Sequence, residues 1–212
     1  MVMGAGYIVF IDPYAPQNVE NYLSYYKRDF NSSEQFSEFQ LLEGNGSRQM
    51  RLNVTSHGSE LRTYRTAVSC TGEYSQYHVG QGSSASSAIA TTMNRVNLIY
   101  ERDFAIRLEL ISNNNSIVYT SPSSDPYNGN NNANLLINES QSNITSVIGS
   151  ANFDVGHTFS TGAGGLACLG CVCSNGSKAS GVTGRSNPIG DPFDIDYVAH
   201  EFGHQFGANH TF

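Results

Sequence analysis

Residues 191–212, with the sequence DPFDIDYVAHEFGHQFGANHTF, hold the pattern that decides how this chain folds and what it can bind. His200 and His204 are four positions apart, so on an α-helix they share one face, about one turn apart. Gly207 can adopt the left-handed conformation that ends a helix, and the bend that follows lets His210 approach the other two rings. Three neutral imidazoles leave the fourth position of a tetrahedral zinc ion open for water, which is typical of a catalytic zinc site.

Glu201 stands directly after the first of these histidines. On a helix it projects beside the expected metal without being forced to ligate it. The alternative interpretation is a histidine-rich helix that holds no metal. Half of the six histidines of the chain fall in this stretch, and their spacing suits a helix, which favours a metal site.

The residues before the histidines predict that they stand on a helix packed against a core. Asp191 followed by Pro192 is a helix start signal, with a capping acid and proline at the first helical position. An apolar stripe then recurs at helical spacing. Its members are Ile195, Val198, Ala199, Phe202 and Phe206.

The histidine stretch resembles HExxHxxGxxH, the zinc signature of the metzincin endopeptidases, and Gly203 is similar to the reprolysin (adamalysin-like) branch. The resemblance runs from about residue 61 to the end, and is closer to secreted bacterial members than to venom or animal ones. It implies a zinc-dependent endopeptidase that hydrolyses internal peptide bonds of proteins or peptides. It also implies that His200, His204 and His210 are ligands of one catalytic Zn2+, and that Glu201 is the general base.

The chain departs from that family pattern at two points. Thr211 follows the third histidine, where reprolysins usually carry Asp. Metzincins also have a methionine turn downstream of the zinc helix, whereas the four methionines here all precede the histidines. We therefore expect residues 61–212 to be the N-terminal (upper) subdomain of a catalytic domain, truncated after the third histidine, and a piece that could be inactive by itself.

Residues 1–60 are predicted to be the remnant of a propeptide. They contain a strand-like run at residues 7–11, a turn signal at Asp12-Pro13, and polar stretches at residues 31–38 and 42–47. An aromatic segment lies between these features, with Tyr22, Tyr25, Tyr26 and Phe30. No cysteine occurs among them, so a thiolate that blocks the zinc before activation cannot come from these residues. The alternative is an additional N-terminal strand of the enzyme itself.

From residue 61 onward the pattern predicts an α/β fold. Strands are expected at residues 61–69, 104–111 and 153–159, and helices at residues 85–100, 134–148 and the histidine stretch. In the second strand, Phe104, Ile106, Leu108 and Leu110 alternate toward one side. Strand-helix-strand order implies a twisted, mostly parallel sheet with a backing helix. With a C-terminal zinc-binding helix, this matches the upper subdomain of a metzincin.

Residues 162–173, GAGGLACLGCVC, precede the histidine helix. By resemblance this stretch supplies an edge strand that lines the cleft and pairs with the substrate backbone. An ordinary glycine-rich loop is the alternative. Residues 162–173 also contain Cys168, Cys171 and Cys173, whereas Cys70 is far away in sequence. Disulfides are favoured over free thiols and over a second metal site, without a defined pairing.

Other residues carry weaker signals. His57, His78 and His157 are interpreted as surface or structural histidines. Glu73 and Asp125 could contribute to a calcium site like that of some reprolysins, but nothing further supports calcium.

The composition limits the classes of partner and location. The net charge of −7 argues against nucleic acid, because phosphate contacts need Lys and Arg. No apolar run approaches the roughly 18 residues of a membrane span. The N-terminus MVMGAGYIVFIDPY lacks a basic region and a small-residue cleavage site, so it predicts no signal peptide. Secretion is therefore implied by the resemblance alone, and the oligomeric state stays open.

A non-catalytic zinc-binding adhesion or scaffold module is the alternative function, although such a module has no need for Glu201.

Overall fold

The computed structural model describes residues 2–4, 7–13, 22–29, 42–43, 60–162 and 164–210. The main sheet has six strands in the order β4-β8-β9-β7-β5-β6. The strands are β4 (Leu42–Glu43), β5 (Arg62–Cys70), β6 (Ile106–Leu110), β7 (Val155–Ser160), β8 (Gly165–Leu169) and β9 (Gly181–Gly184).

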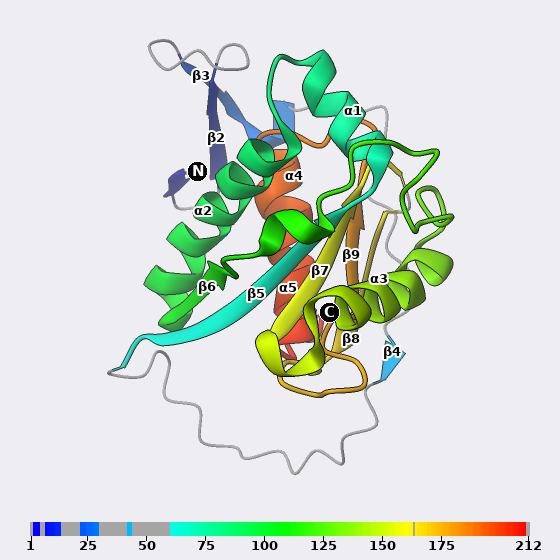
Figure 1. The fold of residues 1–212 in the computed structure, drawn as a ribbon. Coiled ribbons are helices and arrows are strands. Elements are labelled where there is room, and N and C mark those ends of the chain that lie inside the picture. The colour runs from blue at the N-terminus through cyan, green and yellow to red at the C-terminus, as the bar shows by residue number, and fades with distance from the viewer. Residues whose placement is uncertain are drawn as a thin grey trace.

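Parallel pairing dominates this sheet, as the alternation of strands and helices predicts. β5 pairs in parallel with both β6 and β7, and β7 pairs in parallel with β9. β8 runs antiparallel to β9, with Leu166 opposite Val182. On its other side β8 pairs in parallel with the two residues of β4, which lies at the edge of the sheet in Figure 1. The predicted α/β fold of a metzincin-like upper subdomain is confirmed.

Both faces of the sheet are covered, so the central strands β7 and β9 are buried on both sides. Consecutive residues of β5 show the division: Val68 packs into one core cluster and Ala67 into another. The Val68 side is covered by helices α1 and α2 and by the C-terminal helix. The Ala67 side is covered by α3. Figure 1 shows α3 in front of the sheet, with α4 and α5 behind it.

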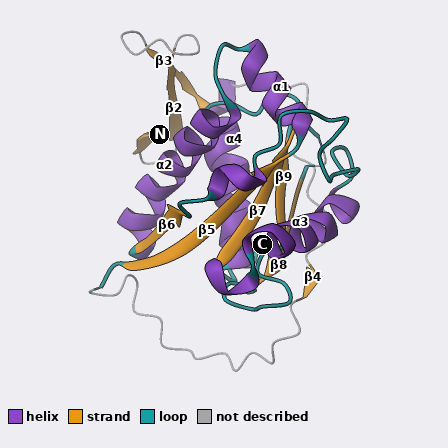
Figure 2. Cartoon of the chain, in the orientation of Figure 1, coloured by secondary structure: helices purple, strands orange, loops and turns teal. Residues whose placement is uncertain are grey.

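The helices follow their apolar periodicity. They are α1 (Gly72–Gly80), α2 (Ala85–Phe104) and α3 (Ala133–Ile148). Short 3-10 turns occur at Lys27–Asp29, Asn114–Ile117 and Ser150–Asn152. In α2 one face is buried as predicted, with Ile89, Met93, Val96 and Tyr100. Helix α3 ends at Gly149, also as predicted, where φ is +83°. Figure 2 shows these helices flanking the strands.

The C-terminal helix has three consecutive parts, α4 (Asp191–Phe193), a π-helix (Asp194–Ala199) and α5 (His200–Gln205). We refer to residues 191–205 together as the C-terminal helix. Of the predicted stripe, Val198 and Phe202 are fully buried, and Ala199 and Phe206 pack at the margin of the same core cluster. A π-helical turn is rare, and such turns occur often beside functional sites.

The N-terminal residues form a second, three-stranded antiparallel sheet from β1 (Val2–Gly4), β2 (Tyr7–Pro13) and β3 (Tyr22–Tyr26). Its buried Phe10 packs edge-on against Tyr25, with 5.5 Å between ring centroids. Lys27 forms an ion pair with Asp196 of the C-terminal helix, with 2.8 Å between Nζ and Oδ1. Phe30 and the polar stretches at residues 31–38 and 44–47 lie outside the described residues.

Three local predictions need correction. Asp12-Pro13 is not a turn, because β2 continues through Pro13 and pairs with Tyr22. Phe104 does not belong to β6. It is the last residue of α2, because the helix continues until Ala105, where φ is +52°. The side chain of Phe104 is 55% exposed. Asp191 does not cap the helix through its side chain; its carboxylate accepts bonds from Arg95 instead.

Candidate metal centre

The imidazoles of His200, His204 and His210 converge at the end of the C-terminal helix. Nε2 of His200 lies 2.8 Å from Nε2 of His204 and 3.3 Å from Nε2 of His210. One ring nitrogen from each residue lies within 4.8 Å of the other two, and this is the group among the described residues that could hold a metal ion. The three predicted site histidines are thus brought together.

The spacing of these nitrogens agrees with the donor set of zinc. Imidazole nitrogens bind zinc at about 2.0–2.1 Å, so two of them in tetrahedral geometry lie about 3.3 Å apart. The distances of 2.8 and 3.3 Å between the Nε2 atoms are close to that value. Three imidazole nitrogen donors, with no fourth His, Cys, Asp or Glu grouped with them among the described residues, fit a zinc ion with one open position.

Local backbone geometry explains how the third histidine reaches the other two. Gly207 has φ of +96°, in the range that glycine adopts without strain, so the predicted left-handed turn is confirmed. The amide of Gly207 donates to the carbonyl of His204 at 2.8 Å, which closes the helix. The carbonyl of Ala208 lies 2.8 Å from Nδ1 of His204. That contact orients the His204 ring so that Nε2 faces the other histidines.

Glu201 is buried, with an exposed fraction of 0%. It lies on the side of α5 that faces strand β8. A Cβ atom built on Gly165 would stand 2.0 Å from its Oε1. The stretch predicted as an edge strand does form a strand, β8, but β8 is not at the edge of the sheet, because β4 pairs along its outer side. The Glu201 carboxylate lies directly against the backbone of β8.

A buried histidine links the sheet to this helix. His157 of β7 has its Nδ1 2.9 Å from Oε1 of Gln205 and its Nε2 2.8 Å from Oγ1 of Thr183. Its ring stacks on Phe202, with 4.6 Å between centroids. Burial lowers the pKa of His157 to about 4, so the imidazole is neutral near pH 7. His157 is structural, as predicted. Its contact with the helix could not be predicted from the sequence, because His157 and Gln205 are 48 positions apart.

The first turns of the C-terminal helix are held by helix α2. Nε of Arg95 lies 3.0 Å from Oδ1 of Asp191 and 3.1 Å from Oδ2 of Asp194. Thr92 donates to Asp194 at 2.7 Å. Tyr100 donates to the carbonyl of Ala199 at 2.8 Å, one residue before His200. Burial, and then the charge of Glu201, raise the pKa of Tyr100, so it acts as a neutral donor.

The structure gives Asp125 a local role in place of calcium binding. Its carboxylate accepts from the amide of Gly72 at 2.6 Å and from that of Tyr127 at 2.9 Å. Neither Glu73 nor Asp125 belongs to a group of potential metal ligands among the described residues. His78 is buried beside Tyr74, and burial lowers its pKa to about 4. His57 lies outside the described residues.

The four cysteines are free thiols, so the expectation of disulfides is wrong for this structure. Cys171 donates to the carbonyl of Cys168 at 3.2 Å. The interaction between these two thiols lowers the pKa of Cys168 to about 7 and raises that of Cys171. Cys70 is buried, and burial raises its pKa to about 11.

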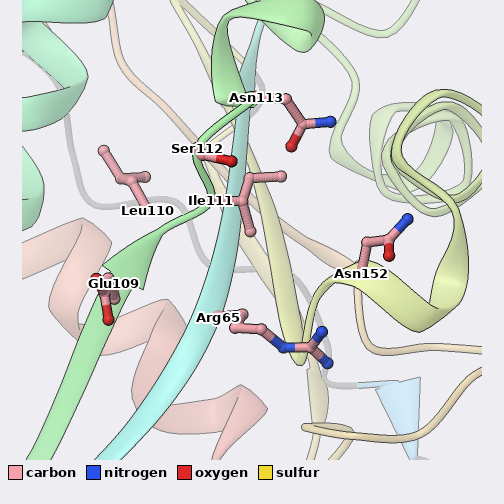
Figure 3. Close-up of a pocket in the computed structure, with 7 residues that line it drawn as sticks. All are labelled: Arg65, Glu109, Leu110, Ile111, Ser112, Asn113 and Asn152. Atoms are coloured by element: carbon pink, nitrogen blue, oxygen red, sulfur yellow. The ribbon is translucent and has the colours of Figure 1, made fainter.

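A polar depression of about 520 Å3 lies apart from the histidines, beside β6 and the end of α3 (Figure 3). Arg65 and Asn152 are among the side chains that line it. Arg65 donates to both carboxylate oxygens of Asp154 and to the carbonyl of Ala151. Because those contacts occupy the guanidinium, the depression offers a ligand little unused charge.

A mostly parallel sheet, packed against a last helix that carries clustered histidines and a buried glutamate, is typical of a metallopeptidase. The chain belongs to metallo-peptidase family M12B, reprolysin-like, whose family model matches residues 60–212. A search of the curated proteins found no match. The family is zinc-dependent and acts on proteins, which confirms the resemblance at the level of a reprolysin-like zinc metallopeptidase. None of the helices among the described residues is long and apolar enough to cross a membrane.

Proposed function

We propose that this chain carries the catalytic centre of a zinc endopeptidase, with His200, His204 and His210 as the metal ligands and Glu201 as the general base. The observation that supports this most is the convergence of three imidazole nitrogens at the end of a helix that also carries the buried carboxylate of Glu201. A site that only holds a metal does not require that carboxylate. The alternative of a non-catalytic zinc-binding module is therefore not favoured.

The roles of the protein groups follow from their places. A zinc ion held by three imidazoles supplies a Lewis acid that polarises a carbonyl and makes a water molecule acidic near neutral pH. Glu201 accepts the proton of the attacking water and passes it to the leaving amine. His204 is kept in one orientation by the Ala208 carbonyl, so its nitrogen needs no reorganisation to serve as a ligand.

Strand β8 is proposed to bind the substrate backbone. It lies next to the edge of the main sheet, and Glu201 contacts it at Gly165. An extended peptide that takes the place of β4 on β8 would run past the carboxylate, held by main-chain hydrogen bonds that do not depend on sequence. This geometry favours cleavage within a chain over removal of a terminal residue.

The proposed domain division assigns residues 61–212 to the upper subdomain of the catalytic domain and residues 1–60 to a propeptide. Two observations support it: the N-terminal strands β1, β2 and β3 form a sheet of their own, and β4 lies on β8, where the substrate is expected. Secretion from a bacterial cell is part of the proposal and rests on the family resemblance.

The test is Glu201→Ala in the full-length protein, assayed with casein. We expect the variant to keep its zinc and to lose at least about 3–4 kcal/mol of transition-state stabilisation, on the order of hundreds-fold in kcat/KM. Glu109→Ala is the matched control, because Glu109 is exposed on β6, and it should retain full activity. A Glu201→Ala protein that cleaves casein at the parent rate would contradict the general-base role.

A further inference from the structure

Gly165 and Glu201 are in closer contact than any residue with a side chain would allow at position 165. A Cβ atom added to Gly165 would lie 2.0 Å from Oε1, 2.7 Å from Cδ and 3.1 Å from Cγ of Glu201. Real Cβ atoms essentially never approach other heavy atoms within 3.0 Å. The space that a side chain at position 165 would need is thus filled by the carboxylate.

The alternation of strands β8 and β9 explains why this contact falls on glycine. Leu166 and Val182 point toward α3 and join its core cluster. Their neighbours Gly165 and Gly181 therefore face the C-terminal helix. Gly181 likewise lies under a side chain of that helix, since a Cβ there would be 2.5 Å from Oε1 of Gln205.

Glu201 and Gln205 are four residues apart, so they lie on the same face of α5, and both are fully buried. The two glycines thus receive two consecutive side chains of one helix face. Gln205 has fixed partners there, because its amide donates to the carbonyl of Gly156 at 2.9 Å. The contact of Gly165 with Glu201 differs in that it involves the proposed general base.

We propose that Gly165 is a positioning residue for the reaction: because it has no side chain, the Glu201 carboxylate can lie against the backbone of β8. This inference rests on the proposed function, since it concerns the place of the general base. A methyl group at position 165 displaces the carboxylate, which is the movable end of its side chain. All three heavy atoms nearest to that methyl group belong to Glu201, so we expect the histidine rings to keep their places.

The experiment compares Gly165→Ala with the parent in the full-length protein. Displacing a catalytic group by about 1 Å costs about 100-fold in rate. We therefore expect kcat to fall about 100-fold, with bound zinc unchanged and KM within about two-fold of the parent value. A loss of zinc in proportion to activity would overturn the proposal, and so would an unchanged kcat.

A second background separates displacement of the carboxylate from general damage. Glu201→Asp has a carboxylate shorter by one methylene, which leaves room for the added methyl group. Adding Gly165→Ala to Glu201→Asp should therefore cost less than about three-fold in kcat, so the two changes are strongly non-additive. Gly181→Ala is the matched control, because it disturbs Gln205 and His157 but not Glu201, and its effect should be the same in both backgrounds. Equal losses from Gly165→Ala in the two backgrounds would overturn the proposal.

If Gly165→Ala does not fold, the melting temperature supplies the readout. Glu201→Ala removes the atoms that the methyl group meets, so Gly165→Ala should fold in that background with the melting temperature of Glu201→Ala alone. Failure to fold there would also overturn the proposal. A fully active Glu201→Ala single variant would instead contradict the proposed function, so the two failures are distinguishable.

Discussion

His157 of strand β7 is joined to Gln205, the residue directly after the proposed ligand His204, with 2.9 Å between Nδ1 and Oε1. The other ring nitrogen lies 2.8 Å from Oγ1 of Thr183, and the ring stacks on Phe202. Both nitrogens are thus used inside the protein, and neither is directed at the histidine cluster. This arrangement connects the middle of the sheet to the metal-binding end of the helix.

Replacing His157 by alanine should lower both stability and zinc affinity. The change leaves Gln205 and Thr183 with unmet buried polar atoms and removes the stacked ring, so we expect a loss of about 2–4 kcal/mol in the free energy of unfolding. Zinc affinity should fall about ten-fold, because the partners that orient a ligand-bearing helix affect the metal. His78→Ala is the control, because this buried histidine packs beside Tyr74 on α1. It should lose stability and keep zinc affinity, whereas equal zinc loss in both variants would contradict the role of His157.

The pKa of His157 also predicts how stability depends on pH. Burial lowers it from the ordinary 6.5 to about 4, so only the unfolded chain gains a proton at this residue between those values. The unfolded state then binds more protons, and stability falls as pH decreases from about 6.5 to about 4. The contribution is on the order of 3 kcal/mol and is fully present above pH 6.5.

Urea unfolding of the metal-free protein at several pH values checks this dependence. His157→Asn cannot titrate, so the stability advantage of the parent over this variant should shrink as pH falls from 7 to 4.5. An advantage that stays constant over this range would show that His157 is not held neutral by burial.

The two glycines within and after α5 should respond in opposite ways to alanine. Gly203 is in the helix, and a Cβ there would meet Tyr100 Oη at 3.6 Å and Ala208 Cβ at 3.9 Å, which are ordinary contacts. Gly203→Ala should therefore stabilise the protein by about 0.5–1 kcal/mol through helix propensity. Gly207 has φ of +96°, so Gly207→Ala should cost about 1–2 kcal/mol and displace His210. Thermal unfolding and zinc titration measure both effects, and a zinc affinity that is unchanged in Gly207→Ala would contradict this account of the third ligand.

Arg95 is expected to be essential for the start of the C-terminal helix. The side chains of Asp191 and Asp194 are only 1% and 4% exposed, and both bind its guanidinium. Arg95→Met removes the guanidinium from two buried carboxylates, which should cost about 3–5 kcal/mol in the free energy of unfolding. Adding Asp191→Asn and Asp194→Asn should recover part of this loss. If urea unfolding gave the Arg95→Met single variant a free energy of unfolding within about 1 kcal/mol of the parent value, the role of Arg95 would be contradicted.

Features that depend on neighbouring residues in sequence could be predicted from sequence alone. The buried face of α2 and the end of α3 at Gly149 follow from helical periodicity and from the preference of helix ends for glycine. The convergence of the three histidines is of the same kind, because it needs only one helix and one glycine turn.

Features that depend on tertiary pairing could not be predicted in this way. The contacts of Gly165 with Glu201 and of His157 with Gln205 join residues 36 and 48 positions apart, so no local pattern shows them. Strand β9 is only four residues long and contains two glycines, and helix α1 begins and ends with glycine, so neither has a strong periodic pattern. The alternation of Phe104 with the residues that follow it predicts a strand, but the preceding helix extends through Phe104.

Metal analysis of the full-length protein tests most directly whether His200, His204 and His210 bind one ion together. Purified protein should contain one zinc per chain, and His204→Ala should lose it, because two imidazoles do not complete the site. His78→Ala, which changes a buried histidine outside the cluster, should retain the zinc. Parent protein that contains no metal after equilibration with zinc, or a His204→Ala variant that binds zinc as tightly as the parent, would contradict the account.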